Sequence, residues 1–174
     1  MDIVEKLLAR HDKATAIEIA QQAVSNPEDF KTLMNCVLSD DKLLVQRGSW
    51  AMRWTFEKNP DLFQEYWKPL IEKLNHPLHD AFPRNVLKMA GEMGTIPEAI
   101  KDELADKCFE FLGSRKQPVA IRVFAMDILE KICSEYPELD NELAMIIEEF
   151  MPHESAGFKS KGKKVLDAIK KRQL

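Results

Sequence analysis

Apolar residues recur with the period of an α-helix along almost the whole chain, and nowhere do four or more residues alternate as in a β-strand. The clearest case is residues 60–74, where one helical face carries Leu62, Phe63, Tyr66, Trp67, Leu70, Ile71 and Leu74. Pro60 suits a helix start, because its missing N–H has no intrahelical partner there. Pro69 lies inside the segment, which predicts either a bent helix or two short helices that abut.

The same proline-opened start recurs four times along the chain. The dipeptides are Asn26-Pro27, Asn59-Pro60, Ile96-Pro97 and Tyr136-Pro137, with separations of 33, 37 and 40 residues. Each segment is followed by a polar break and a second helical segment, predicted at residues 41–58, 78–93, 118–136 and 155–172. Two more helices are expected at residues 2–10 and 12–25. The pattern therefore predicts about ten helices in five antiparallel pairs.

The second helices share a spacing of arginine and apolar residues. Arg47 is followed at +3 and +7 by Trp50 and Trp54, and Arg122 is followed in the same way by Ala125 and Leu129. Steps of 37, 38 and 40 residues connect the +3 positions Trp50, Leu87, Ala125 and Val165. A repeat of this length predicts a helical solenoid, in which neighbouring pairs jointly bury their apolar stripes.

These features resemble the HEAT repeat family, whose second helix carries Val-Arg, then Ala, then Leu. Residues 121–129 fit this pattern closely, and the stretch from Leu38 to Arg47 fits it with one extra residue between Val45 and the arginine. Trp50 stands where the family has a small residue, and the fourth copy has lost its arginine. The resemblance covers residues 27–172.

The resemblance implies an all-α fold, a right-handed α-α superhelix of about five antiparallel helix pairs. We expect one domain over residues 1–174. Within it, residues 1–26 form an N-terminal capping pair, 27–154 the HEAT-like repeats and 155–174 a basic capping helix. Second helices line the concave face in such arrays, so the resemblance implies a protein-interaction module without enzymatic activity that binds a protein partner through that groove.

Five cations on the second helices are the candidate binding residues for this groove: Arg47, Arg53, Arg84, Lys88 and Arg122. A row of cations there suits an acidic partner segment or a phosphate backbone. The alternative is that some of them are structural and bond to neighbouring turns and acids.

Charge is distributed unevenly along the 174 residues, of which 45% are hydrophobic and 31% charged. Residues 158–174 carry one acid and seven cations: Lys159, Lys161, Lys163, Lys164, Lys170, Lys171 and Arg172. This segment has a net charge of +6, so the total of −4 leaves −10 for residues 1–157. We expect a capping helix whose cations complement an acidic body. Binding to nucleic acid or another acidic surface is the alternative, and an anionic membrane is less favoured.

Aromatic residues concentrate in one repeat, which carries Trp50, Trp54 and Trp67 together with Phe56, Phe63 and Tyr66. Trp67 lies within an apolar stripe and is predicted to be core. Trp50 and Trp54 are predicted to be core, or to form a patch that stacks a base or grips a peptide.

HEAT-like repeats also form the alkylpurine DNA glycosylases, which hold DNA in a concave groove beside Trp and Asp residues. A resemblance to these enzymes implies DNA binding as an alternative function. Trp50 and Trp54 near Arg53, and the basic last helix, are similar to that arrangement. The acidic total and the lack of an Asp that matches the catalytic position weigh against DNA binding.

No motif for an enzyme, cofactor or metal site is found in the sequence. His76 and His79 are separated by Pro77 and predict a polar turn capped by Asp80, and His153 is interpreted in the same way. Gly91 and Gly94 predict a helix end and not a phosphate-binding loop. We therefore expect a protein that is not an enzyme and needs no cofactor.

Cysteine spacing and hydropathy predict a cytoplasmic protein. Cys36, Cys108 and Cys133 lie far apart among helix-period apolar residues, as small buried hydrophobes in a reducing compartment do. The longest apolar run, residues 143–147, is far below the roughly 18 residues of a membrane span. The N-terminus lacks the features of a signal peptide.

Overall fold

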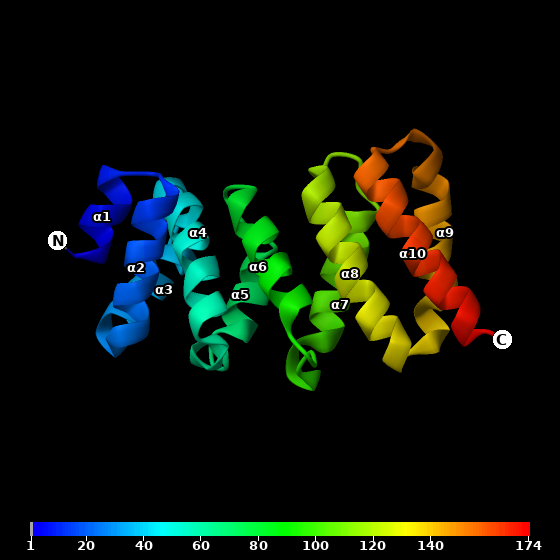
Figure 1. The fold of residues 1–174 in the computed structure, drawn as a ribbon, viewed down its shortest axis with the longest axis horizontal. Coiled ribbons are helices and arrows are strands. Elements are labelled where there is room, and N and C mark those ends of the chain that lie inside the picture. The colour runs from blue at the N-terminus through cyan, green and yellow to red at the C-terminus, as the bar shows by residue number, and fades with distance from the viewer. Residues whose placement is uncertain (1) are drawn as a thin grey trace. The chain divides into compact units, whose positions relative to one another are not determined.

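A computed structural model describes residues 2–174, and within them the fold is all-α with no strand (Figure 1). The ten α-helices are α1 (Ile3–Ala9), α2 (Lys13–Ser25), α3 (Pro27–Leu38), α4 (Lys42–Lys58), α5 (Trp67–Lys73), α6 (Ala81–Glu92), α7 (Glu98–Leu112), α8 (Val119–Glu135), α9 (Asp140–Phe150) and α10 (Ala156–Arg172). Three 3-10 helices join them, η1 (Pro60–Phe63), η2 (Pro137–Leu139) and η3 (Met151–His153). The predicted all-α class is confirmed.

Short polar side chains begin five of these helices, as the sequence signals predict. Asp2, Asp12, Asn26, Asp41 and Ser155 each accept a hydrogen bond from a backbone N–H of the following turn. Such a bond satisfies one of the donors that a helix start leaves unpaired. Before α6 the acceptor is the His79 ring instead of the expected Asp80 carboxylate, since Nδ1 of His79 lies 3.0 Å from the Ala81 backbone nitrogen.

The proline-opened segments differ from one another. Pro27 is the first residue of α3, as predicted, but Pro60 and Pro137 open 3-10 helices and not α-helices. The stretch predicted as residues 60–74 is therefore η1 followed by α5, which confirms the alternative of two short helices. Pro69 lies in the first turn of α5, where its missing N–H leaves no hydrogen bond unmade.

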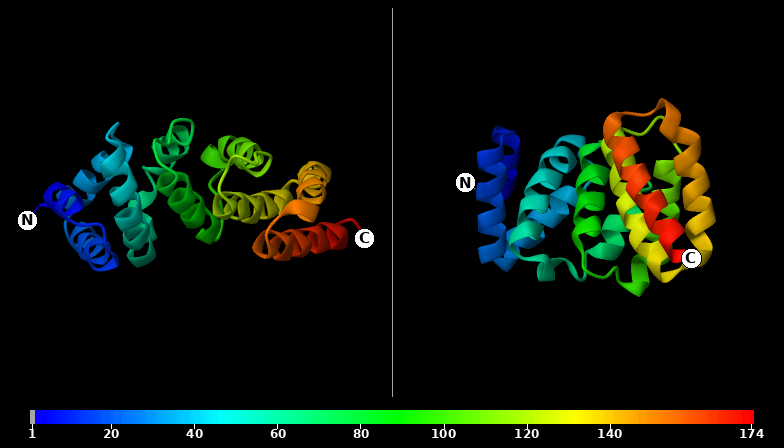
Figure 2. Two further views of the ribbon diagram at one scale, coloured as in Figure 1. Left: turned by 90° about the horizontal axis from the view of Figure 1, so that it is seen from above. Right: turned by 45° about the vertical axis from the view of Figure 1, so that its right-hand side comes forward.

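The chain divides into two compact units, with the boundary inside α6. Unit 1 comprises the described residues up to Met89, and unit 2 comprises Ala90–Leu174. In unit 1, α4 packs against both α2 and α3, and α1 contacts α3 and α4. In unit 2, α8 packs against α7 and α10, and α10 packs against α9 (Figure 2). Within each unit the helices pair antiparallel in two layers, so stacked neighbours bury the apolar stripes jointly.

The core of unit 1 contains a cluster of aromatic rings. Phe63 meets both Phe30 and Phe56 edge-to-face, with ring centroids 5.2 and 5.5 Å apart, and Phe56 meets Trp67 at 5.7 Å. Trp67 is 5% exposed, which confirms its prediction as core. Edge-to-face contacts add to the free energy that burial of these large side chains supplies.

Unit 2 adds buried ion pairs to its apolar core. Lys101 of α7 is 4% exposed, and its Nζ lies 2.7 Å from carboxylate oxygens of both Glu98 and Glu135. Glu135 belongs to α8, so the pair ties two helices together. The hydrogen bonds that Lys101 donates to Glu135 and Glu98 hold its pKa above the usual range.

Two glycines allow close helix approach. A Cβ atom on Gly162 of α10 would lie 2.9 Å from Ile147 Cγ2 and 3.0 Å from Met151 Sδ. On Gly48 of α4 it would lie 3.1 Å from Val37 Cγ2. The second helix of each of these pairs therefore approaches the first through a position without a side chain.

Candidate functional site

Two arginines of the repeat pattern, Arg47 and Arg122, are structural residues. The guanidinium of Arg47 donates from Nη1 to the carbonyl oxygens of Leu7 and Leu8, at 2.7 and 2.9 Å. These carbonyls belong to the last turn of α1, where they have no intrahelical partner. Arg47 is half-buried, and its guanidinium connects α4 to the end of α1 within unit 1.

Arg122 was expected in the binding row, but the structure places it in the interior of unit 2, where it is 2% exposed. Its Nε donates to the Leu112 carbonyl at the end of α7, and its Nη1 pairs with Glu154. The guanidinium carbon lies 4.6 Å from the ring centroid of Phe150 and 4.8 Å from that of Phe158. Its contacts therefore connect α8 to α9 and α10 inside unit 2.

The remaining second-helix cations lie nearer the surface. Arg84 is exposed and Lys88 is half-buried, one turn apart on the same face of α6. Arg53 of α4 pairs with Glu57 across one turn at 3.1 Å. Of the five expected binding residues, Arg84 is exposed, and Arg53 and Lys88 are half-buried.

Trp50 and Trp54 lie next to the cations of unit 1, and both are half-buried. The Trp50 ring meets His11 edge-on at 5.4 Å. Nζ of Lys13 lies 5.0 Å from the Trp54 ring centroid, and Arg53 lies 6.0 Å from it. The Trp54 indole nitrogen is buried without a hydrogen-bond partner. Lys13 of α2 and Arg53 of α4 thus lie near the Trp54 ring, and Trp50 packs against His11.

The basic C-terminal segment folds as α10, and its cations fall into two groups, those paired with acids and those exposed on the surface. Lys161 pairs with Asp127, and Arg172 donates to Asp140 at 2.7 Å and to Glu130 at 3.0 Å. The hydrogen bond to the buried Asp140 raises the pKa of Arg172. These bonds fit the predicted complement to an acidic body. Five other cations on α10 are exposed: Lys159, Lys163, Lys164, Lys170 and Lys171.

Sequence reasoning missed the role of Lys131. Its Nζ donates to the carbonyl oxygens of Gly91 and Met93, the latter at 2.8 Å, where α6 ends. The position carries no signal in the sequence, because its partners lie about forty residues earlier.

Residues 2–174 contain no group of three or more His, Cys, Asp and Glu side chains placed to hold a metal ion. Among the same residues, no helix is long and apolar enough to cross a membrane. The three cysteines are buried thiols. Burial raises the pKa of Cys108, and raises that of Cys133 to about 12, so neither thiol is an activated nucleophile.

The sequence matches a known family of helical repeats over most of its length. The model of the HEAT repeat domain matches residues 3–169, a span that includes the first helix pair as well as the repeats expected from residue 27 onward. Neither a curated protein nor a solved structure gives a significant match. Because the family model spans nearly all ten helices, the chain belongs to the HEAT repeat domain family.

Proposed function

We propose that this protein is a non-enzymatic interaction module that binds an acidic segment of a partner protein on its second helices. HEAT repeats generally mediate protein interactions, and the family membership supports this class of function. The expected groove also included Arg47 and Arg122. Because these two arginines bond to other parts of the chain, we assign the contact with the partner to Arg53, Arg84 and Lys88 on α4 and α6.

The observation that carries this proposal is the exposed face of α6. Arg84 and Lys88 lie four residues apart, so one acidic segment can meet both, and Arg84 is exposed. Unit 1 thus offers positive charge although the chain has a net charge of −4. Complementary charge at the rim of an interface favours the right partner and speeds its association.

Affinity capture with charge-reversed variants tests the proposal. We expect Arg84→Glu/Lys88→Glu to lose a defined set of proteins that the unaltered chain retains from lysate, as counted by quantitative mass spectrometry. The matched control is Lys164→Glu/Lys171→Glu, which makes the same change in charge on the exposed face of α10. Identical protein sets for both variants would contradict the assignment. Truncation of residues 158–174 is unsuitable, because it removes the buried Phe158, Val165 and Ile169.

A second candidate, DNA binding, draws on the surface around Trp54. Lys13 and Arg53 flank this ring, and a cationic aromatic surface can stack a base beside a phosphate. Electrophoretic mobility of a short DNA with the protein at about 50 mM salt tests it, since phosphate contacts are strongest at low salt. A shift that Lys13→Glu abolishes supports DNA binding, and an unshifted DNA contradicts it.

We also propose that the protein works in a reducing compartment such as the cytoplasm. Three buried thiols without a disulfide suit such a compartment. Fractionation of cells that express a tagged chain tests this, and recovery in the secretory pathway would contradict it.

A further inference from the structure

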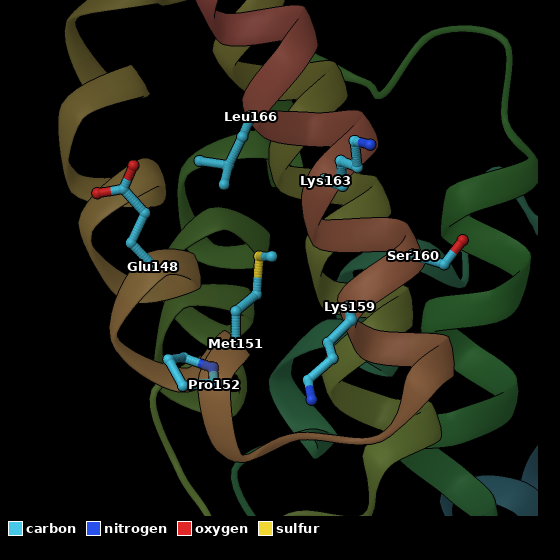
Figure 3. Close-up of a pocket in the computed structure, with 7 residues that line it drawn as sticks. All are labelled: Glu148, Met151, Pro152, Lys159, Ser160, Lys163 and Leu166. Carbon is cyan, nitrogen blue, oxygen red and sulfur yellow. The ribbon is translucent and has the colours of Figure 1, made fainter.

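A groove of about 540 Å³ lies between α9 and α10 in unit 2. Its walls are Glu148 of α9, Met151 and Pro152 of η3, and four residues of α10: Lys159, Ser160, Lys163 and Leu166. The side chains of Met151 and Leu166 extend into the space between the two helices, as Figure 3 shows. The floor is therefore apolar, and lysines stand along the α10 edge.

Helical spacing extends the groove by one more turn. On α10, Lys159, Lys163 and Leu166 share a stripe with Lys170, four residues beyond Leu166. On α9, Met145 precedes Glu148 by three residues and Pro152 by seven, so it lies on the same outer face. Met145 is 70% exposed, an unusual position for a large apolar side chain. Met145 therefore adds an exposed apolar side chain to this face, beyond the residues that line the groove.

The groove faces away from α8. α10 contacts α8 through other residues, including Lys161, which pairs with Asp127, and Phe158, whose ring lies against Arg122. α10 therefore packs one face against α8, and its groove face, beside α9, is directed to solvent. Neighbouring helices of this fold cover such apolar grooves by packing across them.

We propose that this groove binds an amphipathic helix of a partner protein, with acidic residues on the edge that meets α10. The groove between two helices matches the ridge of a third, and apolar anchors at helical spacing would cover Met145, Met151 and Leu166. The charges set the orientation, because Lys159 and Lys163 line one edge and Glu148 the other. The site shares no residue with the surface on α4 and α6 and does not depend on it.

A synthetic peptide tests this site directly. The probe is a fluorescein-labelled helical peptide of about 14 residues, roughly four turns, with Leu along one stripe and Glu along one edge. Fluorescence anisotropy with the full chain measures its affinity. We expect saturable binding that weakens at high salt and weakens when the Glu residues are replaced by Gln, because rim charges are screened.

Two pairs of charge reversals locate the binding. Lys159→Glu/Lys163→Glu should weaken the affinity for the peptide by about tenfold, since two favourable charge contacts become repulsive. The matched control is Lys164→Glu/Lys171→Glu, which lies on another exposed stripe of α10, about 100° round the helix, and should leave the affinity within about twofold. Met145→Gln, at a 70% exposed position, should weaken binding without harm to the fold, which circular dichroism checks.

Three results would overturn the proposal. The first is no saturable binding up to about 1 mM peptide, the weakest affinity that a specific contact of this kind would show. The second is an equal loss of affinity in both reversal pairs, which would reveal a nonspecific charge effect. The third is self-association in sedimentation experiments that Lys159→Glu/Lys163→Glu abolishes, because a second copy of the chain would then be the occupant.

Discussion

The two units of this protein contain the same kind of helix pair but stabilise it in different ways. In unit 1, rings meet edge-to-face around Phe63, and Arg47 binds backbone carbonyls. In unit 2, buried or half-buried cations pair with acids, as Lys101, Arg122 and Arg172 do. The repeat pattern therefore specifies where a helix lies, and each unit supplies its own interactions between helices.

The difference is clearest at the two arginines that occupy the same place in the repeat. Both donate to carbonyl oxygens at the end of a first helix, α1 for Arg47 and α7 for Arg122. Arg122 also has a carboxylate partner, Glu154, which is largely buried. An arginine can be buried as deeply as Arg122 only with such a partner, because an unpaired buried charge is costly.

Trp67→Ala gives one of the two largest expected effects and tests the aromatic cluster of unit 1. Removal of this 5% exposed ring should lower the free energy of unfolding of unit 1 by about 3–5 kcal/mol, because a cavity remains among Phe56 and its neighbours. Hydrogen exchange followed by mass spectrometry measures each unit separately. An unchanged unit 1 would show that the aromatic cluster does not stabilise it.

Arg122→Ala should have an effect of similar size in unit 2, about 3–5 kcal/mol, because Glu154 is left without its partner. The equivalent change in unit 1, Arg47→Ala, should cost about 1.5–3 kcal/mol, since it removes hydrogen bonds from a charged group to carbonyls and leaves no buried acid. Chemical denaturation of both variants measures the difference.

A paired apolar replacement separates charge from packing at this position. Arg122→Met/Glu154→Met removes both charges and should recover most of the stability, because no ion is then left unpaired. A double variant as unstable as Arg122→Ala would show that Arg122 acts mainly through its contacts with Phe150 and Phe158.

Much of the fold could be predicted from the sequence, because the signals for its helices are local. Asp41 and Ser155 mark helix starts, Pro27 opens α3, and the apolar stripe around Trp67 identifies it as core. The 3-10 helices after Asn59 and Tyr136 were missed, because a proline suits the first turn of either helix type.

The candidate site was less predictable, because its geometry depends on residues distant in sequence. Arg122 fits the family pattern, but its partner Glu154 lies 32 residues further on. The groove between α9 and α10 depends on how closely Gly162 lets the two helices approach. Helical spacing places Lys161 on a different face of α10 from Lys159 and Lys163, but the sequence does not show that Asp127 pairs with it.

Gly162→Ala should have a smaller effect and act on the packing of unit 2. The added Cβ would meet Ile147 and Met151, so we expect a loss of about 1–3 kcal/mol, which exceeds the gain of about 1 kcal/mol in helix propensity. Gly91→Ala in α6 is the control, because nothing lies within 4 Å of its Cβ position. That variant should stabilise the protein by about 0.5–1 kcal/mol. Thermal unfolding compares the two, and equal shifts would contradict the close approach.

The smallest expected effect concerns pH and the ion pairs of Lys101. Its hydrogen bond lowers the pKa of Glu98 below the usual 4.5, while the carboxylates of Glu135 and Glu98 raise that of Lys101 above the usual 10.5. The contribution of Glu98 is therefore complete above about pH 4.5 and is lost as the pH falls through its lower folded pKa. That of Lys101 is complete below about pH 10.5 and is lost only at higher pH.

Lys101→Met should consequently flatten the acid side of the stability profile of unit 2, because Glu98 then titrates nearer its usual pKa. Lys6→Met is the matched change in unit 1, where Lys6 lowers the pKa of Glu18. Unfolding followed by hydrogen exchange between about pH 3 and 7 measures both profiles. All three tryptophans lie in unit 1, so their fluorescence gives an independent measure of that unit. If Lys6→Met flattens the profile of unit 1 as much as Lys101→Met flattens that of unit 2, ion pairing does not distinguish the two units.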